Sequence, residues 1–524
     1  MVTTQASDLP GTAVRSPSGV RLVLNTASTF VGQAVVLIVT FLSIPYVTRE
    51  LGSAQYGTLS LLIICVYSGS ILNLGINISL VKYLAELMPK GEMENVQKYF
   101  GTALTALVGL GLLVGVAIFT AAEPIVRHFI NDNGQFSAAA HLALRISSLA
   151  FVLQFLAQVL IAVLAGAQRL EIVSAVNSTA ETLRLIGTVV IVCLGGKLVA
   201  LMSLTVAVGV GTCLVYYVAA KRLEPRLRLR PSFSLPHFRS LINHSKFVLI
   251  GNTSRQLVGS ADNLLIGYSL PVANLAYYGI AFSIAQRLWT LVGNVANVVF
   301  PAASAFSGSN QDSQVKELYL RSTKIAAAAG CFPALALAVF SREFMFYWLS
   351  SEFSTHGAIV LALLSIGVLV NSFSFVPYQT LQSTTHAAVT AKGSILYAAI
   401  NIVMFILLIP HFGLTGAAVA FLISQFAFVP LFTFMADRLI GVPHSAVLAG
   451  YARVFTVALS ACALIWLCRG VVHSLVSLGL LVGAGLALYT ALTYRFVFDD
   501  RERGACRGVL APVLQRLFPA AGRG

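Results

Sequence analysis

Charged residues are scarce in this chain. Only 10% of its 524 residues are Asp, Glu, Lys or Arg, whereas a soluble domain carries about 25%. Hydrophobic residues make up 57%, and the mean hydropathy is +0.84. This composition excludes an ordinary soluble protein. It predicts an all-α polytopic membrane protein, in which each crossing needs about 20 consecutive apolar residues.

The cysteine spacing indicates no paired framework, and the first 20 residues predict no cleavable leader. The seven cysteines lie mostly inside apolar runs and show no Cys-x-x-Cys spacing. They are therefore interpreted as small buried side chains, and the spacing indicates neither a metal site nor a disulfide framework. Residues 1–20 contain Pro10 and Pro17 but no apolar core. They predict a flexible cytoplasmic tail before an uncleaved first helix, not a signal peptide.

Fourteen apolar windows predict about 14 transmembrane helices. Helices 1–6 would form an N-lobe over 21–220, helices 7–12 a C-lobe over 247–435, and helices 13–14 would occupy 436–497. A basic cytoplasmic linker, 221–246, would join the lobes, and 498–524 would be a cytoplasmic tail. The expected spans are 22–44, 57–79, 101–120, 142–164, 172–194, 198–220, 247–268, 275–301, 325–346, 356–376, 387–409, 413–435, 449–469 and 474–495.

The net charge of +15 is distributed unevenly over the predicted loops. An even number of spans places both termini on one side of the membrane. The loops on that side hold 25 Lys and Arg, and the loops on the other side hold six. The positive-inside rule therefore places both termini in the cytoplasm. The basic balance follows from this topology, so it requires no nucleic-acid partner.

The two halves of the chain resemble each other. Residues 25–32 (Asn-Thr-Ala-Ser-Thr-Phe-Val-Gly) parallel residues 252–259 (Asn-Thr-Ser-Arg-Gln-Leu-Val-Gly), and a Tyr-Gly pair follows each, at Tyr56 and Tyr278. Both copies begin on the cytoplasmic side, which indicates a parallel repeat with a pseudo-two-fold axis along the membrane normal. Such repeats are typical of alternating-access transporters with a site near the bilayer midplane.

Three arginines lie inside predicted spans and belong to no loop. They are Arg184, Arg255 and Arg287, each about 14–18 Å from an end of its helix at 1.5 Å per residue. Ionisable groups in a membrane normally face the bundle interior or a wet cavity. Because a guanidinium matches phosphate oxygens, these arginines predict a cavity for a phosphate or pyrophosphate headgroup. Arg255 is the first choice of phosphate ligand.

Further polar residues share helix faces with these arginines or lie on the first two spans. On 247–268 the polar arc around Arg255 covers about 120°. These residues could equally be interhelical hydrogen-bonding groups, and Glu181 with Arg184 could be a structural i,i+3 pair. Asp262 is favoured as a structural or gating partner over a proton carrier. The predicted cavity and gating residues are Asp262, Glu181, Asn252, Gln256, Asn25, Asn73, Asn77, Gln286 and Asn294.

Three passages resemble a known family. They are residues 45–57 (Pro-Tyr-Val-Thr-Arg-Glu-Leu-Gly-Ser-Ala-Gln-Tyr-Gly), residues 262–267 with the following Tyr-Tyr-Gly at 277–279, and the run from Asn401 through Ile409-Pro410 to 413–418 (Gly-Leu-Thr-Gly-Ala-Ala). In this order they are similar to the polysaccharide flippases (O-antigen or exopolysaccharide repeat-unit, Wzx-like) of the multidrug/oligosaccharidyl-lipid/polysaccharide exporter superfamily. The likeness covers about 22–440.

The resemblance implies a V-shaped bundle that moves a polyprenyl-pyrophosphate-linked oligosaccharide from the cytoplasmic to the outer leaflet of a bacterial inner membrane. The implied partners are this lipid, membrane lipids and the polysaccharide polymerase or export machinery. No cofactor is implied; some members use an ion gradient, and the sequence does not distinguish H⁺ from Na⁺. The longest outer loop, 121–141, offers only Glu123 and Asp132 near His128, which argues against an enzyme.

Two other functions of the same superfamily stay open. A lipid II-type flippase also handles a lipid pyrophosphate. The sequence therefore distinguishes poorly between this function and the flipping of a lipid-linked oligosaccharide. Multidrug or cation antiporters commonly keep a carboxylate within the first helix. Residues 22–47 contain none, which disfavours that alternative.

Overall fold

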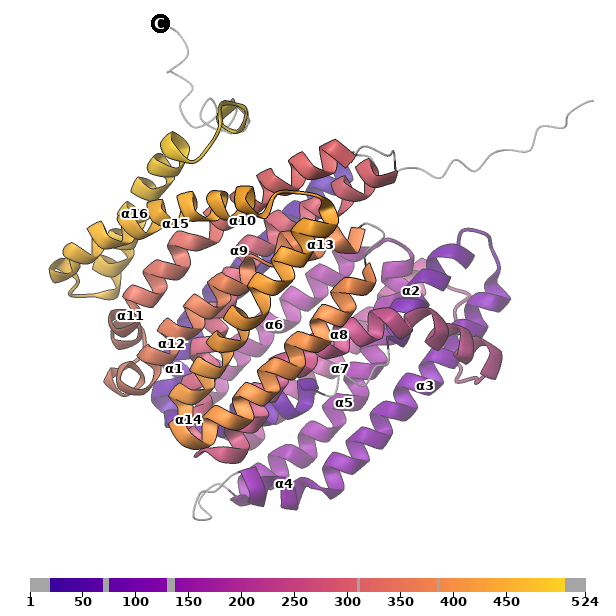
Figure 1. Cartoon of the computed structure of the whole chain (residues 1–524). Helices are drawn as coiled ribbons and strands as arrows, with labels where there is room; N and C mark the ends of the chain where they lie inside the picture. The colour runs from indigo at the N-terminus through magenta and orange to yellow at the C-terminus, as the bar shows by residue number, and fades with distance from the viewer. Residues whose placement is uncertain (1–18, 69–74, 130–136, 309–311, 384–386, 505–524) are drawn as a thin grey trace, which may run out of the picture.

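The computed structural model describes residues 19–68, 75–129, 137–308, 312–383 and 387–504 (Figure 1). These residues form sixteen α-helices and one 3-10 helix, and no strand occurs among them. The helices are α1 (Gly19–Ser68), α2 (Ile76–Leu87), α3 (Met93–Thr120), α4 (Ala122–Phe129), α5 (Ser137–Gly166), α6 (Leu170–Cys193), α7 (Leu198–Leu223), α8 (Leu235–Ser269), α9 (Ala273–Gly308), α10 (Asp312–Val339), α11 (Ser341–Trp348), α12 (Ser351–Ser372), α13 (Phe375–Ser383), α14 (Ala387–Ile440), α15 (His444–Leu467), η2 (Arg469–Val471) and α16 (Leu475–Phe496).

The helices follow the apolar runs of the sequence. Within the described residues, ten segments are long and apolar enough to cross a membrane. Two of them, Val35–Cys65 and Ala388–Ile440, contain a bend and each covers parts of two expected spans. The expected spans 247–268 and 275–301 lie within α8 and α9. The prediction of an all-α, multi-pass membrane protein is confirmed.

A single glycine bends each of the two longest helices. Gly52 in α1 has φ 73° and ψ 167°, and Gly413 in α14 has φ 60° and ψ −137°. Residues with a Cβ rarely adopt such conformations, and glycine adopts them readily. A straight helix of 54 residues would be about 80 Å long, far more than a bilayer core of about 30 Å. The bends therefore divide α1 and α14 into segments of membrane-crossing length.

The helices pack in two groups that meet along α1. In the first group α5 packs against α2, α3 and α7, and α1 packs against α6. In the second group α9 packs against α10, α12 and α13, and α8 packs against α14. α1 and α2 contact α8, and α1 also contacts α9. α15 and α16 lie at the outside of the second group, beside α10 and α11 (Figure 1).

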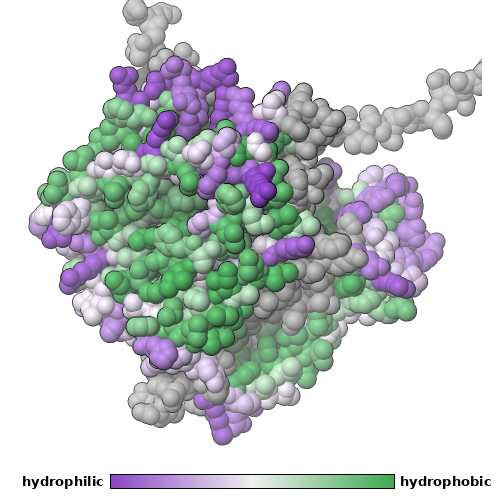
Figure 2. Space-filling view, in the orientation of Figure 1, coloured by the Kyte–Doolittle hydropathy of each residue, from purple (hydrophilic) through white to green (hydrophobic). Residues whose placement is uncertain are grey.

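The surface reflects this arrangement. Figure 2 shows a broad hydrophobic band across the visible face, with hydrophilic residues gathered above and below it. Lys324 on α10 forms ion pairs with Asp499 and Glu502, both at 2.8 Å. Lys324 and Glu502 are largely buried, so the pairs attach the segment that follows α16 to the bundle.

Candidate functional site

A cavity lies where the two helix groups meet. Its volume is about 320 Å³, and its walls come from α1, α6, α7, α8 and α9. Two of the three intramembrane arginines, Arg184 on α6 and Arg287 on α9, line it together. The polar lining comprises Thr40, Ser43, Tyr56, Ser60, Glu181, Arg184, Thr188, Thr205, Asn263, Ser283 and Arg287.

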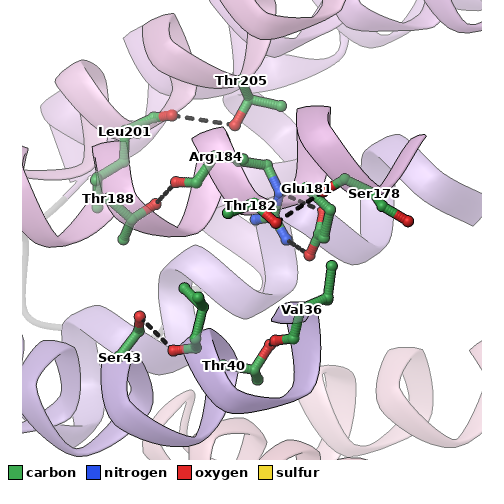
Figure 3. A network of polar contacts seen from close by, with 11 residues as sticks. Val36, Thr40, Ser43, Ser178, Glu181, Thr182, Arg184, Thr188, Leu201 and Thr205 are labelled. Carbon is green, nitrogen blue, oxygen red and sulfur yellow. Dashed lines mark hydrogen bonds and ion pairs between the residues drawn. The ribbon is translucent and has the colours of Figure 1, made fainter. Parts of the chain in front are cut away.

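Arg184 is held by a carboxylate of its own helix. Its Nε donates to Glu181 Oε2 at 3.0 Å, and its Nη2 donates to Glu181 Oε1 at 2.5 Å. Figure 3 shows both side chains projecting from α6 toward α1, where Thr40 and Ser43 lie. The pair is the i,i+3 arrangement that the sequence allows. Because both side chains also line the cavity, the pair orients a cation within it.

Arg287 differs from Arg184 in having no such partner. Its side chain is exposed to the cavity, and among the described residues no carboxylate lies within 4.0 Å of its guanidinium. Arg184, Arg287 and Glu181 together leave the described lining with one net positive charge. Within a membrane such a charge attracts an anion, since little water is present to screen it.

Five hydroxyl groups of the lining donate to backbone carbonyl oxygens, those of Thr40, Ser43, Ser60, Thr188 and Thr205. Thr40 Oγ1 donates to Val36 O at 2.7 Å, and Ser43 Oγ donates to Val39 O at 2.6 Å. Thr188 bonds its own helix in the same way, at 2.7 Å. A hydroxyl that donates to a carbonyl keeps its lone pairs as acceptors. The cavity thus offers guanidinium donors for an anion and oxygen acceptors for a ligand that carries hydroxyl groups.

The structure brings some of the predicted residues to the cavity and places others elsewhere. Glu181, Arg184 and Arg287 line it. Asp262 is 2% exposed, and its carboxylate accepts hydrogen bonds from Tyr278 Oη and from the backbone N–H of Asn263. Asp262 is absent from the described cavity lining, and its role as a structural or gating partner stays a prediction. Its neighbour Asn263 lines the cavity instead.

Asn77 and Gln286 do not reach the cavity lining. The Nδ2 of Asn77 donates to Gln158 Oε1 on α5 at 2.5 Å, so this asparagine bonds one helix to another. Gln286 is exposed but absent from the lining, and it lies about 100° around α9 from its neighbour Arg287. A polar arc of about 100° on a helix is wider than the part of the helix that faces the cavity.

Several predicted residues lie outside the part that the structure describes. The side chains of Asn25, Asn252, Arg255, Gln256 and Asn294 are among them, as is the whole of Asn73. The first-choice phosphate ligand, Arg255, therefore stays a prediction. The internal repeat, 25–32 and 252–259, falls almost entirely on the same undescribed side chains.

The sequence reading missed other parts of the lining. Tyr56, Ser60 and Thr205 line the cavity, as do the apolar side chains of Leu59 and Phe282. Tyr56 belongs to one of the passages that resemble the family, but nothing in its spacing indicated that its side chain faces the cavity. Thr205 lies in an apolar run beside Ser203, and each hydroxyl donates to a carbonyl oxygen of its own helix, an arrangement that needs no cavity to explain it.

The two helix groups are joined beyond the cavity, at the end near the Gly52 bend. Arg49 Nη2 donates to the carbonyl oxygen of Leu349 at 3.4 Å. Gly57 packs so closely against the α8–α9 turn that a Cβ there would lie 2.8 Å from the carbonyl carbon of Val272. The bundle is therefore closed at this end.

The fold and the cavity define a polytopic transporter-like bundle with a cationic site between two helix groups. Residues 46–356, more than half of the chain, match the polysaccharide biosynthesis protein family. The chain belongs to this family. It is 24% identical over 456 residues to the Haloferax volcanii protein named Probable low-salt glycan biosynthesis flippase Agl15, covering 86% of this chain and 91% of that protein.

Two groups of solved transporters share the fold. The structure titled lipid II flippase MurJ, inward closed conformation, matches with a TM-score of 0.72 and 14% identity, over 90% of this chain and 99% of that one. An inward-facing multidrug resistance MATE family transporter of the MOP superfamily matches with a TM-score of 0.67 and 15% identity, over 79% and 98%. The predicted relationship to polysaccharide biosynthesis proteins is confirmed by the family match, and the fold is shared with these transporters.

Proposed function

We propose that this protein flips a polyprenyl-pyrophosphate-linked oligosaccharide across a bacterial inner membrane, from the cytoplasmic to the outer leaflet, for surface polysaccharide synthesis. One observation carries the proposal: Arg184 and Arg287 come from different helix groups and line one cavity. A ligand held by both would contact both groups, so its binding would respond to their relative movement. This is the requirement for alternating access.

The chemistry of the cavity suits part of this substrate. Phosphate oxygens match guanidinium groups, and sugar hydroxyls can donate to the oxygen acceptors of the lining. A volume of about 320 Å³ is near the lower limit of ligand pockets, roughly 300–1,000 Å³. It fits a pyrophosphate with little sugar, and we infer that the helix groups separate to admit the rest.

The proposed orientation places both termini in the cytoplasm, on the basis of the positive-inside rule. The closed end near Gly52 then faces outward, which agrees with the inward conformations named in the titles of both similar structures. The proposed lobes are 21–220 and 247–435, joined by the linker 221–246. Handover of the flipped lipid to polysaccharide polymerase or export machinery would take place at the outer face.

The test is a leaflet-resolved assay of the lipid-linked oligosaccharide in cells depleted of the protein. Repeat units should accumulate on the cytoplasmic leaflet and return to normal with the wild-type chain. Arg287→Ala should restore less than a tenth of the surface polysaccharide at equal membrane abundance, because an anion ligand is lost. The matched control is Arg438→Ala, which removes an exposed arginine from the last turn of α14 and should restore export fully.

The outcomes separate the alternatives. Accumulation in the outer leaflet would contradict the proposal, since flipping would then precede the defect. Accumulation of lipid II, with rescue by an established lipid II flippase, would identify that substrate instead. Multidrug or cation antiport is disfavoured by the net positive lining, and it would show as drug resistance that depends on this chain.

A further inference from the structure

A second cavity lies on the outside of the first helix group, between the start of α6 and the end of α7. Its volume is about 560 Å³. Ile172 lies on the α6 side, and Leu214, Val215 and Val218 lie on the α7 side. Leu214 and Val215 are 58% and 50% exposed, so the groove opens sideways, away from the protein. We name it the α6–α7 groove.

The depth of the groove corresponds to one membrane leaflet. From Leu214 to Arg222 is eight residues, or about 12 Å of helix. The hydrocarbon core of a bilayer is about 30 Å thick, so the apolar wall is close to half of it. The groove therefore accommodates an acyl chain that enters from one face of the membrane and ends near the midplane.

Two arginines lie at the end of this apolar wall that is farther from the membrane midplane. Arg169 precedes α6 directly, and Arg222 lies in the last turn of α7. Both positions are helix termini, where a membrane protein meets the headgroup layer. A groove with apolar walls along the acyl region and guanidinium groups at headgroup depth matches an amphiphile with an anionic head.

The charges beside the groove indicate the net charge of the lipid headgroup that would bind there. Arg169 Nη1 pairs with Glu171 Oε1 at 3.3 Å and stays 45% exposed. Among the described residues, no carboxylate lies within 4.0 Å of Arg222. Two arginines and one glutamate leave one net positive charge, which complements a phosphodiester with one negative charge. A zwitterionic headgroup has no net charge to match it.

The groove is separate from the cavity between the helix groups. Ile172 and Glu181 are nine residues apart on α6, which places them on opposite faces at 100° per residue. Glu181 lines the cavity, and Ile172 lines the groove. Helix α6 thus contributes Arg184 to the cavity between the helix groups and Ile172 to the wall of the α6–α7 groove.

We propose that the α6–α7 groove binds an anionic glycerophospholipid of the surrounding bilayer, with its phosphodiester at Arg169 and Arg222 and an acyl chain along Leu214 and Val218. The bound lipid fills the space beside α6 and thereby supports the helix that positions Arg184. This site does not depend on the proposed flippase activity, because it needs only a protein embedded in a membrane.

The test is native mass spectrometry of the purified, delipidated full-length protein. The protein is offered equal amounts of phosphatidylglycerol and phosphatidylcholine with the same acyl chains. We expect about tenfold preferential retention of phosphatidylglycerol. Arg169→Ala/Arg222→Ala should reduce the preference to twofold or less. The matched control, Arg226→Ala/Arg239→Ala, removes two exposed arginines outside the groove and should leave the preference unchanged.

A second variant tests the apolar wall without changing charge. Val218→Trp fills the groove at an exposed position and should abolish retention of both lipids while the protein stays monodisperse. This variant also tests the groove if the double arginine variant does not fold. Equal retention of the two phospholipids by the wild type, or loss of preference in the control, would overturn the proposal. So would displacement of phosphatidylglycerol by an equimolar polyprenyl phosphate, which would make the substrate lipid the occupant.

Discussion

The indole of Trp348 on α11 donates a hydrogen bond from Nε1 to the carbonyl oxygen of Phe41 on α1, at 3.0 Å. Its ring also stacks on the Phe41 ring, with centroids 5.0 Å apart and planes 20° apart. The two residues are far apart in sequence and belong to different helix groups. Their contact closes the bundle at the same end as the pair formed by Arg49 and Leu349.

Trp348→Ala should favour opening at this end. The stacked pair contributes about 1 kcal/mol and the hydrogen bond about 1 kcal/mol. Their joint loss would shift the equilibrium between closed and open states roughly 30-fold. The measurement is the distance distribution between spin labels at the exposed Glu50 and Thr355, in a variant whose native cysteines are replaced.

Phe346→Ala is the control for this prediction. Phe346 lies on the same short helix, is 50% exposed and packs edge-on against Tyr347. Its removal should leave the distances as in the parent. If Trp348→Ala also left the distances unchanged, the Trp348–Phe41 contact would have no role in closure.

Gly57→Ala should disrupt the same closed end by overpacking. A methyl group at Gly57 would overlap the carbonyl of Val272 in the α8–α9 turn, and backbone cannot move aside as a flexible side chain can. We expect a loss of stability of about 1–3 kcal/mol, measured as a lower midpoint of thermal unfolding in detergent. Gly109→Ala on α3 is the matched control, because nothing lies within 4 Å of its Cβ position. It should be neutral or slightly stabilising.

Arg184→Ala should harm transport more than removal of the whole ion pair. The single change leaves Glu181 unpaired in the cavity, so that its carboxylate repels an anionic headgroup. The double change Glu181→Ala/Arg184→Ala removes both charges and keeps the attraction of Arg287. We expect the double variant to retain several-fold more flipping than Arg184→Ala in reconstituted vesicles. Equal rates for the two variants would show that Glu181 does not act on the substrate.

The linker before α8 should loosen as the pH falls. Burial, followed by the charge of Lys98, lowers the pKa of His237 below its ordinary value of 6.5. His237 Nδ1 lies 2.6 Å from Ser234 Oγ, and its ring packs edge-on against Tyr99. The neutral imidazole is therefore favoured in the docked state. Its stabilising contribution is present above pH 6.5 and is lost as the pH falls through the lowered pKa.

Hydrogen exchange of residues 225–240 checks this prediction. Protection factors, corrected for intrinsic exchange, should fall between pH 7.5 and 5.5 in the wild type. His237→Gln should lose most of this pH dependence while keeping a polar side chain near Ser234. If the protection factors of His237→Gln still fell with pH as in the wild type, another titrating group would cause the loosening.

The sequence predicted the helices well because an apolar run is a local property. Even the two intramembrane arginines that meet at the cavity, Arg184 and Arg287, could be placed at similar depth by counting residues. The residues that α1 contributes to the cavity lining were harder to predict. This helix continues to Leu51 and resumes directly after Gly52, so the connection expected between two spans is helical. The expected break between 44 and 57 placed Tyr56 in a loop and not on a helix that faces the cavity.

Polar residues on one helical arc could not be sorted without the packing. Gln286 and Arg287 are neighbours in sequence, yet only the arginine lines the cavity. Asn77 was predicted for the cavity but donates a hydrogen bond to Gln158. In each case the identity of the facing helix decides the role, and that helix comes from a distant part of the chain.

In the proposed orientation, with both termini in the cytoplasm, the bends at Gly52 and Gly413 face outward, and they then affect how this protein can be probed from outside a cell. A turn made by one glycine leaves no stretch of extended chain at that point. A protease therefore has no segment to bind there, and an inserted epitope would have to break a helix. Surface labelling of intact cells should accordingly favour the longer connections and pass over both of these turns.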